Sequence, residues 1–401
     1  MKNVLIICEY NPFHNGHAYQ IKKTKELFPD ARVICLMSPN FVQRGESAVF
    51  HKYTRANAAL LGGADLVLSL PFVFSTLSAE GFCEAGVQIG KALGVDALVF
   101  GAEDSDERLC EIAAVQSTDT FSKEVEVLCK KEPSLSLQEA GELLIREKLG
   151  TEYSALVKKP NNILAIEYIK AIKKTKAPIT PVSIKRVGEG YKSLSDSQLP
   201  SATLIRQKIC ANEDFKEGVP EKIRALYEKS INSGSFSVPE KYESFLRCSL
   251  LSKSRDELIS LFKNRELASR LYKSLRECES FEDAIIKAAT SRITHTRIKR
   301  AALSAAFGIS HNRFMHDTPS FVQVLAMNPR GREFLSCQRK NDSIVILTKS
   351  ADYVKYGGEK FKEQFLYEIR ADEIWASIAN APLSPNCFMK ISPIISDEVN
   401  K

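Results

Sequence analysis

Two histidines that could bind a phosphate group lie near the N-terminus, in the stretch Glu9-Tyr10-Asn11-Pro12-Phe13-His14-Asn15-Gly16-His17. A short apolar run at residues 4–8 precedes this stretch, and residues 16–28 favour a helix directly after it. The first turn of a helix attracts phosphates, because its backbone N–H groups have no partner within the helix and its dipole is positive there. Two imidazoles at that place could donate hydrogen bonds to one phosphate, and Gly16 would let the backbone approach it. A lone histidine is more often a surface residue, but this spacing after an apolar run favours the phosphate site.

A second group of phosphate-binding side chains lies about 185 residues later, in the run Leu199-Pro200-Ser201-Ala202-Thr203-Leu204-Ile205-Arg206. Ser201 is a good N-cap for a helix that begins there. Backbone N–H groups, a hydroxyl and a guanidinium together suit a phosphate contact. Either group alone could arise by chance, but two in this order, each at a predicted helix start, are much stronger.

The elements around these groups alternate between strand and helix. Strands are predicted at residues 4–8, 32–37, 66–70 and 97–100, and helices at 16–28, 52–61 and 80–93. The strands are continuous apolar runs, which is typical of a parallel sheet covered by helices on both faces. Ligands bind such sheets beyond the carboxyl ends of the strands. The candidate sites are therefore the turns at residues 9–17, 38–46, 71–78 and 101–104.

Later residues are predicted to be mainly helical. Residues 105–158 and 241–310 favour helices, Pro160 and Ser201 each begin another, and a further helix starts at about Glu359. Residues 181–187 and 344–347 are predicted strands, the second standing alone. The Ser- and Gly-rich residues 230–239 are the best candidate for a linker.

The composition, 401 residues of which 44% are hydrophobic and 26% charged, is that of an ordinary globular protein and excludes a collagen-like or mostly disordered chain. The net charge of +7 is concentrated in residues 241–310, which hold 14 Lys and Arg against 8 Asp and Glu. A run of basic residues is usually a solvated helix face. The regional surplus permits an anionic partner at residues 292–300 but does not by itself require one.

Neither a membrane segment nor a metal site is expected. The most apolar stretch, residues 64–77, is too short and too interrupted to span a bilayer. No two of the ten cysteines form a C-x-x-C pair, so we expect them to be reduced and mostly buried, as in a cytoplasmic protein.

The first stretch resembles the HIGH-type signature of the nucleotidyltransferase superfamily, which includes class I aminoacyl-tRNA synthetases and pantetheine-phosphate adenylyltransferase. The second resembles that superfamily's S-x-T-x-I-R signature and keeps its Ser, Thr and Arg. The resemblance implies a Rossmann-like fold and attack on the α-phosphate of ATP with release of pyrophosphate.

A longer resemblance, to the tRNA(Met) cytidine acetate ligase family, runs over most of the chain. That family makes acetyl-adenylate from ATP and acetate, then acetylates the exocyclic amine of the wobble cytidine in elongator tRNA(Met). The matching runs are residues 7–20, Gln43-Arg44-Gly45-Glu46, Pro160-Asn161-Asn162-Ile163-Leu164, Lys185-Arg186-Val187-Gly188 and Ile293-Thr294-His295-Thr296-Arg297-Ile298-Lys299-Arg300.

The resemblance implies a role for each matched residue. Three are expected to be catalytic: His14, His17 and Arg206. ATP, with Mg²⁺ carried on its phosphates, is expected at Ile7, Cys8, Glu9, Tyr10, Asn11, Pro12, Phe13, His14, Asn15, Gly16, His17, Ala18, Tyr19, Gln20, Gly101, Asn162, Arg186, Ser201 and Thr203. The acetate or tRNA substrates are expected at Arg44, Lys185, Arg292, Arg297, Lys299 and Arg300. The expected domains are a Rossmann-like ATP-binding nucleotidyltransferase domain over residues 1–232 and a mainly helical, basic, tRNA-binding domain over 233–401.

Two other functions remain open from the sequence. An adenylyltransferase for a small phosphorylated metabolite would explain the two signatures but would leave the residues after the linker without a role. A non-catalytic RNA-binding protein on a decayed nucleotidyltransferase fold is less favoured, because both signatures are intact. The sequence identifies no general base, no oligomeric state, no basis for choosing acetate and no feature of the tRNA that is read.

Overall fold

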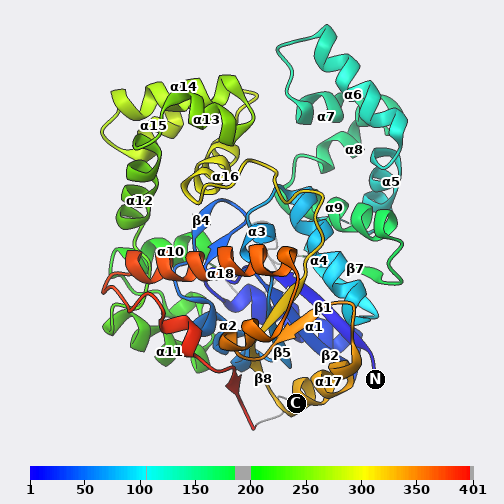
Figure 1. Cartoon of the computed structure of the whole chain (residues 1–401). Helices are drawn as coiled ribbons and strands as arrows, with labels where there is room; N and C mark the ends of the chain where they lie inside the picture. Colours follow the sequence, from blue (N-terminus) through cyan, green and yellow to red (C-terminus); the bar gives the residue numbers. More distant parts are fainter. Residues whose placement is uncertain (105, 186–199, 398–401) are drawn as a thin grey trace.

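One mixed sheet organises the molecule. The computed structural model describes residues 1–104, 106–185 and 200–397 (Figure 1). The strand order is β10-β8-β5-β2-β1-β6-β7, with β9 beside β8. All pairs are parallel except β5 with β8. The predicted α/β fold with a mostly parallel sheet is therefore confirmed.

The four strands predicted in the first hundred residues are present and form the centre of the sheet. They are β1 (Asn3–Cys8), β2 (Arg32–Met37), β5 (Leu66–Ser69) and β6 (Ala97–Ala102), and every residue of β2 is buried. β7 (Thr180–Lys185) extends the sheet beyond β6. Cys8 of β1 pairs with Met37 of β2, so these strands end level with each other. The loops that follow them therefore meet at one edge.

The end of the chain returns to the same sheet, which the sequence does not predict. The strands concerned are β8 (Phe321–Met327), β9 (Val345–Leu347) and β10 (Ile394–Ile395). The strand expected to stand alone, β9, pairs with β8. A short apolar run such as β8 cannot be distinguished from a buried helix by its periodicity, so it was missed. The division of the chain at residue 232 stays a prediction, but the later part contributes three strands to the sheet of the earlier part.

Helices cover both faces of the sheet. They are α1 (Asn15–Leu27), α2 (Lys52–Leu61), α3 (Phe72–Ser75), α4 (Ala79–Leu93), α9 (Pro160–Thr175), α10 (Ala202–Cys210), α11 (Glu221–Asn232), α17 (Pro329–Cys337) and α18 (Glu359–Ile378). A small hairpin of β3 (Phe41–Val42) and β4 (Glu46–Ser47) follows β2. Short 3₁₀ turns lie at Lys216–Gly218, Gln338–Lys340, Ser350–Lys355 and Cys387–Lys390.

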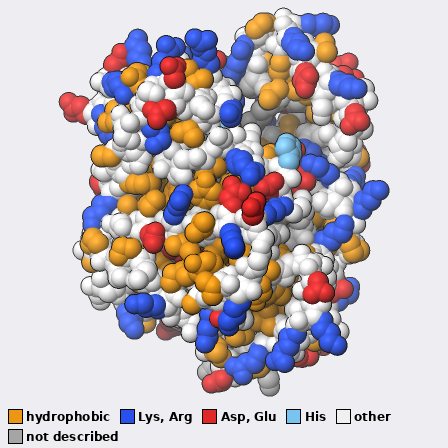
Figure 2. Space-filling model, in the orientation of Figure 1, with side chains coloured by type: hydrophobic (Ala, Val, Ile, Leu, Met, Phe, Trp, Pro, Cys, Tyr) orange, Lys and Arg blue, Asp and Glu red, His pale blue; other side chains and the backbone are white. Residues whose placement is uncertain are grey.

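Two groups of helices stand above the carboxyl edge of the sheet (Figure 1). The first is α5 (Asp106–Gln116), α6 (Asp119–Lys131), α7 (Leu137–Leu149) and α8 (Thr151–Leu156). The second is α12 (Pro239–Leu251), α13 (Arg255–Phe262), α14 (Arg265–Glu277), α15 (Phe281–Ala288) and α16 (His295–Ala306). These confirm the predicted helical character of both regions. Figure 2 shows Lys and Arg side chains gathered over the outer end of the second group, as its surplus of basic residues requires.

The predicted linker is packed in place. Phe236 forms an isolated antiparallel β-bridge with Phe50, and Ser237 forms another with Ala379. The Ser237 hydroxyl lies 2.8 Å from that of Ser47 at the end of β4. The segment that leads from α11 to α12 is therefore held against the sheet domain on one side and the end of α18 on the other.

Candidate active site

His14 and His17 begin α1 as a reciprocal pair. Nδ1 of His14 accepts a hydrogen bond of 3.0 Å from the backbone N–H of Gly16, and Nδ1 of His17 accepts one of 3.3 Å from the backbone N–H of His14. Their rings stack with centroids 3.8 Å apart. Because Nδ1 of each neutral imidazole is an acceptor, Nε2 carries the hydrogen. Each ring therefore presents an N–H donor, as a phosphate-binding histidine should, and the predicted helix start is confirmed.

The rings of buried aromatic residues pack against this pair of histidines and support its position. The ring of Tyr10 lies 4.7 Å from that of His17 and 4.8 Å from that of Phe13, and both aromatic residues are almost fully buried. Gly16 is needed for the position of His14, because a side chain at this residue would collide with the imidazole. A Cβ at this residue would lie 2.8 Å from Cε1 of His14. Any side chain here would therefore displace the imidazole.

Arg206 joins the two signatures, which the sequence places far apart. Ser201 caps α10 by accepting from the backbone N–H of Leu204, so the second predicted helix start is also confirmed. One turn further along α10, Nη1 of Arg206 donates to the carbonyl oxygen of Asn11 at 2.8 Å. Its Nη2 donates to the hydroxyl of Thr203 at 3.3 Å. The structure thus brings the three expected catalytic residues to the same edge of the sheet.

Arg55, which the sequence reasoning missed, ties the loops of this edge together. It is fully buried on α2, and its guanidinium donates to the carbonyl oxygens of Glu9, Ser38, Pro39 and Phe50. Burial lowers its pKa to about 10, which still leaves it charged at neutral pH. The sequence carried no clear signal for this role, because the predicted helix over residues 52–61 holds Lys52 and Arg55 among mixed polar and apolar residues.

The carboxylate of Glu9 links the loop after β1 to the loop after β2. Its Oε1 accepts from the backbone N–H of Gln43 at 2.8 Å. Burial raises the pKa of Glu9, while the hydrogen bond from Gln43 and the charge of Arg44 act in the opposite direction. Arg44 itself is exposed at the turn of the β3–β4 hairpin.

Asn162 holds the loop after β6. Its Oδ1 accepts from the backbone N–H of Glu103 at 3.0 Å, and its Nδ2 donates to Asp104 and to the carbonyl of Leu156. The buried amide therefore positions the loop that follows Gly101. Contacts of Gly101 and Asn162 with ATP stay a prediction.

The remaining sheet residue expected at the site is Lys185, which is exposed at the end of β7. Arg186 lies outside the described residues.

The basic residues of α16 reach the sheet domain through the β3–β4 hairpin. A Cβ at Gly45 would lie 2.6 Å from the backbone nitrogen of Arg300, so hairpin and helix touch. Burial lowers the pKa of Arg300 to about 10, and Arg297 adds to this effect. Lys299 forms an ion pair of 3.0 Å with Glu282, and Arg292 is exposed just before the helix. The structure therefore brings α16 close to the hairpin that carries Arg44.

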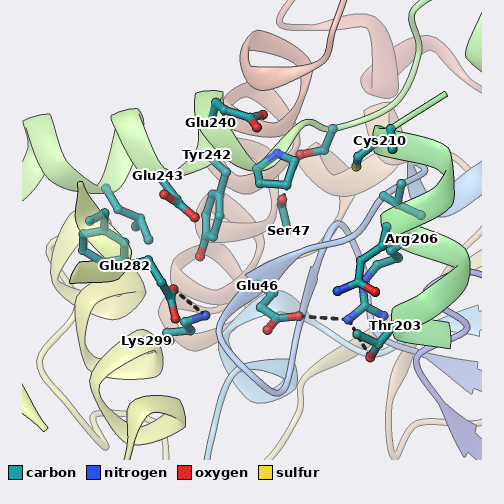
Figure 3. A pocket seen from close by; sticks show the side chains of 17 residues that line it. Glu46, Ser47, Thr203, Arg206, Cys210, Glu240, Tyr242, Glu243, Glu282 and Lys299 are labelled. Atoms are coloured by element: carbon teal, nitrogen blue, oxygen red, sulfur yellow. Dashed lines mark hydrogen bonds and ion pairs between the residues drawn. The ribbon is translucent and has the colours of Figure 1, made fainter. Parts of the chain in front are cut away.

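A cavity of about 520 Å³ lies where these two groups of residues meet. Figure 3 shows Glu46 between Arg206 on one side and Lys299 on the other. Glu46 Oε2 lies 3.5 Å from Nη2 of Arg206. The lining residues that had no predicted role are Glu46, Ser47, Val49, Gln207, Cys210, Ala211, Ser237, Pro239, Glu240, Tyr242, Glu243, Leu246, Phe281 and Glu282. Only Glu46 stood in a run matched to the family, and the others carried no signal in the sequence.

Among the residues that the structure describes, no group of three or more His, Cys, Asp or Glu side chains is placed to hold a metal ion. No described helix has both the length and the apolar character needed to cross a bilayer.

Comparisons with known proteins agree on one family. Residues 1–387 match the family model described as HIGH Nucleotidyl Transferase. The tRNA(Met) cytidine acetate ligase of Caldicellulosiruptor saccharolyticus is 35% identical over 385 residues, which cover 94% of each protein. The enzyme of the same name from Thermosipho africanus is 35% identical over 87% of this chain and 85% of its own.

A solved structure extends the agreement to three dimensions. The crystal structure of Thermotoga maritima TmcAL bound with alpha-thio ATP matches with a TM-score of 0.90 and 30% sequence identity. The match covers 99% of this chain and 100% of that one. Because family model, relatives and structure each span most of the chain, it belongs to the HIGH nucleotidyl transferase family and, within it, to the tRNA(Met) cytidine acetate ligase family.

Proposed function

We propose that this chain is an ATP-dependent ligase that activates acetate as acetyl-adenylate and transfers the acetyl group to tRNA. The acceptor is the exocyclic amine of the wobble cytidine in elongator tRNA(Met), and the product is N4-acetylcytidine. One observation carries the proposal. Arg206 contacts the His14–His17 loop through Asn11 and also faces the cavity that Lys299 of the basic helix closes on the other side. Residues of both signatures and a residue of α16 therefore lie close together, as a nucleotide site beside an RNA-binding helix would require.

In the first step an acetate oxygen attacks the α-phosphorus of ATP, and pyrophosphate leaves with the electrons of the broken P–O bond. Negative charge rises on the phosphate oxygens in the transition state. The Nε2–H groups of His14 and His17 and the guanidinium of Arg206 are the donors assigned to that charge. Preorganised donors of this kind stabilise the transition state more than the ground state.

In the second step the cytosine amine attacks the acetyl carbon, the bond from that carbon to the adenylate oxygen breaks, and the amine loses a proton. The products are acetylated tRNA and AMP. The amine is a weak nucleophile, because its lone pair is delocalised into the ring. Holding donor and acceptor in contact can contribute up to about 7–11 kcal/mol towards lowering such a barrier.

The expected partners are a metal ion, acetate and tRNA. Mg²⁺ would be carried on the ATP phosphates, which could supply most of its ligands. The relatives' names, which specify tRNA(Met), cytidine and acetate, support the RNA and acetate substrates. The tRNA lies along Arg292, Arg297, Lys299 and Arg300, with Arg44 and Lys185 at the edge of the sheet. A tRNA substrate implies a cytoplasmic enzyme.

A single assay tests this function. The chain is incubated with ATP, labelled acetate and an elongator tRNA(Met) transcript, and the nucleosides are analysed by mass. We expect label in N4-acetylcytidine, and none when the wobble cytidine is replaced by uridine. Absence of labelled tRNA while ATP still binds contradicts the proposal. Transfer of AMP to a phosphorylated metabolite without RNA would favour the adenylyltransferase instead.

A further inference from the structure

The cavity between α10, α12 and the β3–β4 hairpin has walls of two kinds. Apolar walls come from Val49, Leu246 and Phe281, which are buried, and from the ring of Tyr242. The Tyr242 hydroxyl donates to the carbonyl of Gly45 at 2.7 Å, which fixes that ring against the hairpin. An apolar wall that includes a fixed aromatic ring suits a planar base.

The polar groups of the cavity are mainly carboxylates. Glu46 and Glu282 are each paired with a cation, Arg206 and Lys299 respectively. Glu240 and Glu243 also line the cavity and form no ion pair within the part of the chain that the structure describes. Burial raises the pKa of Glu243, and the charge of Glu282 raises it further. Four carboxylates line the cavity against two cations, both of them already paired, so the cavity is unfavourable for the triphosphate.

A carboxylate beside apolar walls gains from a further hydrogen-bond donor, because the 3.5 Å contact of Glu46 with Arg206 is too long for a strong hydrogen bond. The exocyclic amine of cytosine is such a donor, and Glu or Asp is the side chain that accepts from it. In RNA, bases of single-stranded loops are unstacked at low cost and are read along their base-pairing edge. We propose that this cavity binds the cytosine ring of the acceptor nucleotide, with the Glu46 carboxylate accepting a hydrogen bond from the amine that becomes acetylated.

The position of Glu46 determines which way the amine of a bound cytosine would point. This inference rests on the proposed function. Glu46 and Arg206 line the same cavity side by side, with Oε2 of Glu46 3.5 Å from Nη2 of Arg206, and Arg206 also contacts Asn11 in the loop after β1 (Figure 3). An amine held by Glu46 would therefore lie next to the residue assigned to the α-phosphate. Uracil carries an acceptor oxygen at the position of the cytosine amine, so the Glu46 carboxylate repels it. Glu46 is thus the residue that selects cytidine over uridine.

The decisive variant is Glu46→Gln, which keeps the size of the side chain and removes its charge. Two tRNA(Met) transcripts are compared that differ only in cytidine or uridine at the wobble position. We expect the wild-type chain, loaded with a non-hydrolysable ATP analogue, to bind the cytidine transcript about 5- to 150-fold more tightly. In Glu46→Gln this preference falls to less than threefold, and acetylated tRNA per acetyl-adenylate formed falls at least tenfold.

Acetate-dependent exchange of pyrophosphate into ATP, measured without tRNA, separates the possible failures. Exchange by wild type with no preference for cytidine overturns the cavity assignment alone, and so does a preference that Glu46→Gln retains. A fall in exchange as large as the fall in acetylation also overturns it, because Glu46 then acts through Arg206. No exchange in the wild-type chain contradicts the proposed function itself.

A second variant tests the cavity without touching a carboxylate. Cys210 is exposed and lines the cavity from α10, so Cys210→Trp fills it without disturbing the core. We expect loss of the preference for cytidine and at least tenfold less acetylated tRNA per adenylate. Cys337→Trp, on exposed α17 away from the cavity, is the matched control and changes neither quantity. Equal behaviour of the two variants would refute the assignment.

Discussion

The hydrogen bonds that begin α1 also orient the two imidazoles. Both Nδ1 atoms accept hydrogen bonds from backbone N–H groups. The same hydrogen bonds therefore cap the helix and determine the direction in which each Nε2–H points. A functional side chain is usually fixed by separate packing contacts. Here the local backbone of residues 14–17 fixes two of them, and the buried rings of Tyr10 and Phe13 prevent the loop from collapsing.

The variant His17→Gln tests the catalytic role of His17 while keeping the helix cap. Glutamine at the third helical position can still accept from the backbone N–H of residue 14, so the fold should be stable. The Nε2–H donor is displaced, and we expect acetate-dependent pyrophosphate exchange to fall about 10²–10³-fold, the usual effect of removing one transition-state donor. His316→Gln, at an exposed histidine, is the control and keeps wild-type exchange. Exchange within threefold of wild type in His17→Gln would remove His17 from catalysis.

Gly16→Ala tests the close approach of the backbone to His14. The added Cβ would stand 2.8 Å from Cε1 of the imidazole, so the ring has to move. We expect at least tenfold less pyrophosphate exchange with a nearly unchanged unfolding midpoint, because the residue lies at a helix start rather than in the core. Gly357→Ala, where a Cβ meets nothing within 4 Å, should leave exchange unchanged. The two variants are compared in parallel, and equal rates would contradict the stated role of Gly16.

At the scale of the element, α2 has a histidine cap whose protonation state matters for stability. Nδ1 of His51 accepts from the backbone N–H of Thr54 at 3.2 Å, and Trp375 and Phe388 lie beside its ring. Burial lowers the pKa of His51 from 6.5 to about 3, and the charges of Arg55 and Lys52 act in the same direction. The folded chain therefore keeps this imidazole neutral.

The pH dependence of stability follows from that difference. Below pH 6.5 the unfolded chain takes up a proton at His51 that the folded chain does not, so stability is complete above pH 6.5 and falls as the pH drops towards 3. His51→Asn keeps a good cap and cannot be protonated. We expect the wild type to lose about 1 kcal/mol more than this variant for each pH unit between 6.5 and 5, measured by denaturant unfolding. His316→Asn should follow the wild type, and identical curves for all three proteins would contradict the prediction.

The helix α16 is the element that we assign to tRNA phosphates. The double variant Arg297→Glu with Lys299→Glu reverses two charges on it. We expect loss of most tRNA affinity and a salt dependence of binding that is shallower by about two phosphate contacts. Pyrophosphate exchange without tRNA should stay within threefold of wild type. Arg339→Glu with Lys340→Glu, two exposed residues beyond α17, is the matched control. Equal tRNA affinity for both double variants would exclude α16 from the RNA surface.

At the scale of the whole molecule, the C-terminal helix α18 holds the loop that leads to the site. The ammonium of Lys52 lies 2.8 Å from Glu368 and 2.7 Å from Asp372, and all three side chains are buried. Asp372 also accepts from Asn40, and Glu368 accepts from the backbone N–H of Phe72. Burial raises the pKa of Asp372 to about 7, against the attraction of Lys52. Residues from α2, α3 and α18 therefore meet in one buried group, which also holds Asn40 just before the β3–β4 hairpin.

Lys52→Met leaves two buried carboxylates without their cation. We expect a loss of about 3–5 kcal/mol in the free energy of unfolding. Adding Glu368→Gln and Asp372→Asn removes both charges while keeping acceptors for Phe72 and Asn40, and should restore most of that loss. Lys362→Met, at an exposed residue of α18, should change stability by less than about 0.5 kcal/mol. A triple variant as unstable as Lys52→Met would show that charge burial is not the cause.

Local patterns were enough to predict the centre of the fold and the two signatures. Strands β1, β2, β5 and β6 are continuous apolar runs because helices bury both of their faces, and that pattern is visible in a single sequence. The starts of α1 and α10 were visible because capping depends only on neighbouring residues.

Only the tertiary structure decided which distant residues meet. The contact of Arg206 with Asn11, the four carbonyls around Arg55 and the place of Glu46 in the cavity depend on how loops from separate strands converge. Strand β8 also could not be predicted from local patterns, because its partner β5 lies far away in the chain. Residue types and spacing along the chain determined the two signatures. The side chains between them came together through burial and strand pairing, which act across the whole chain and leave no local pattern.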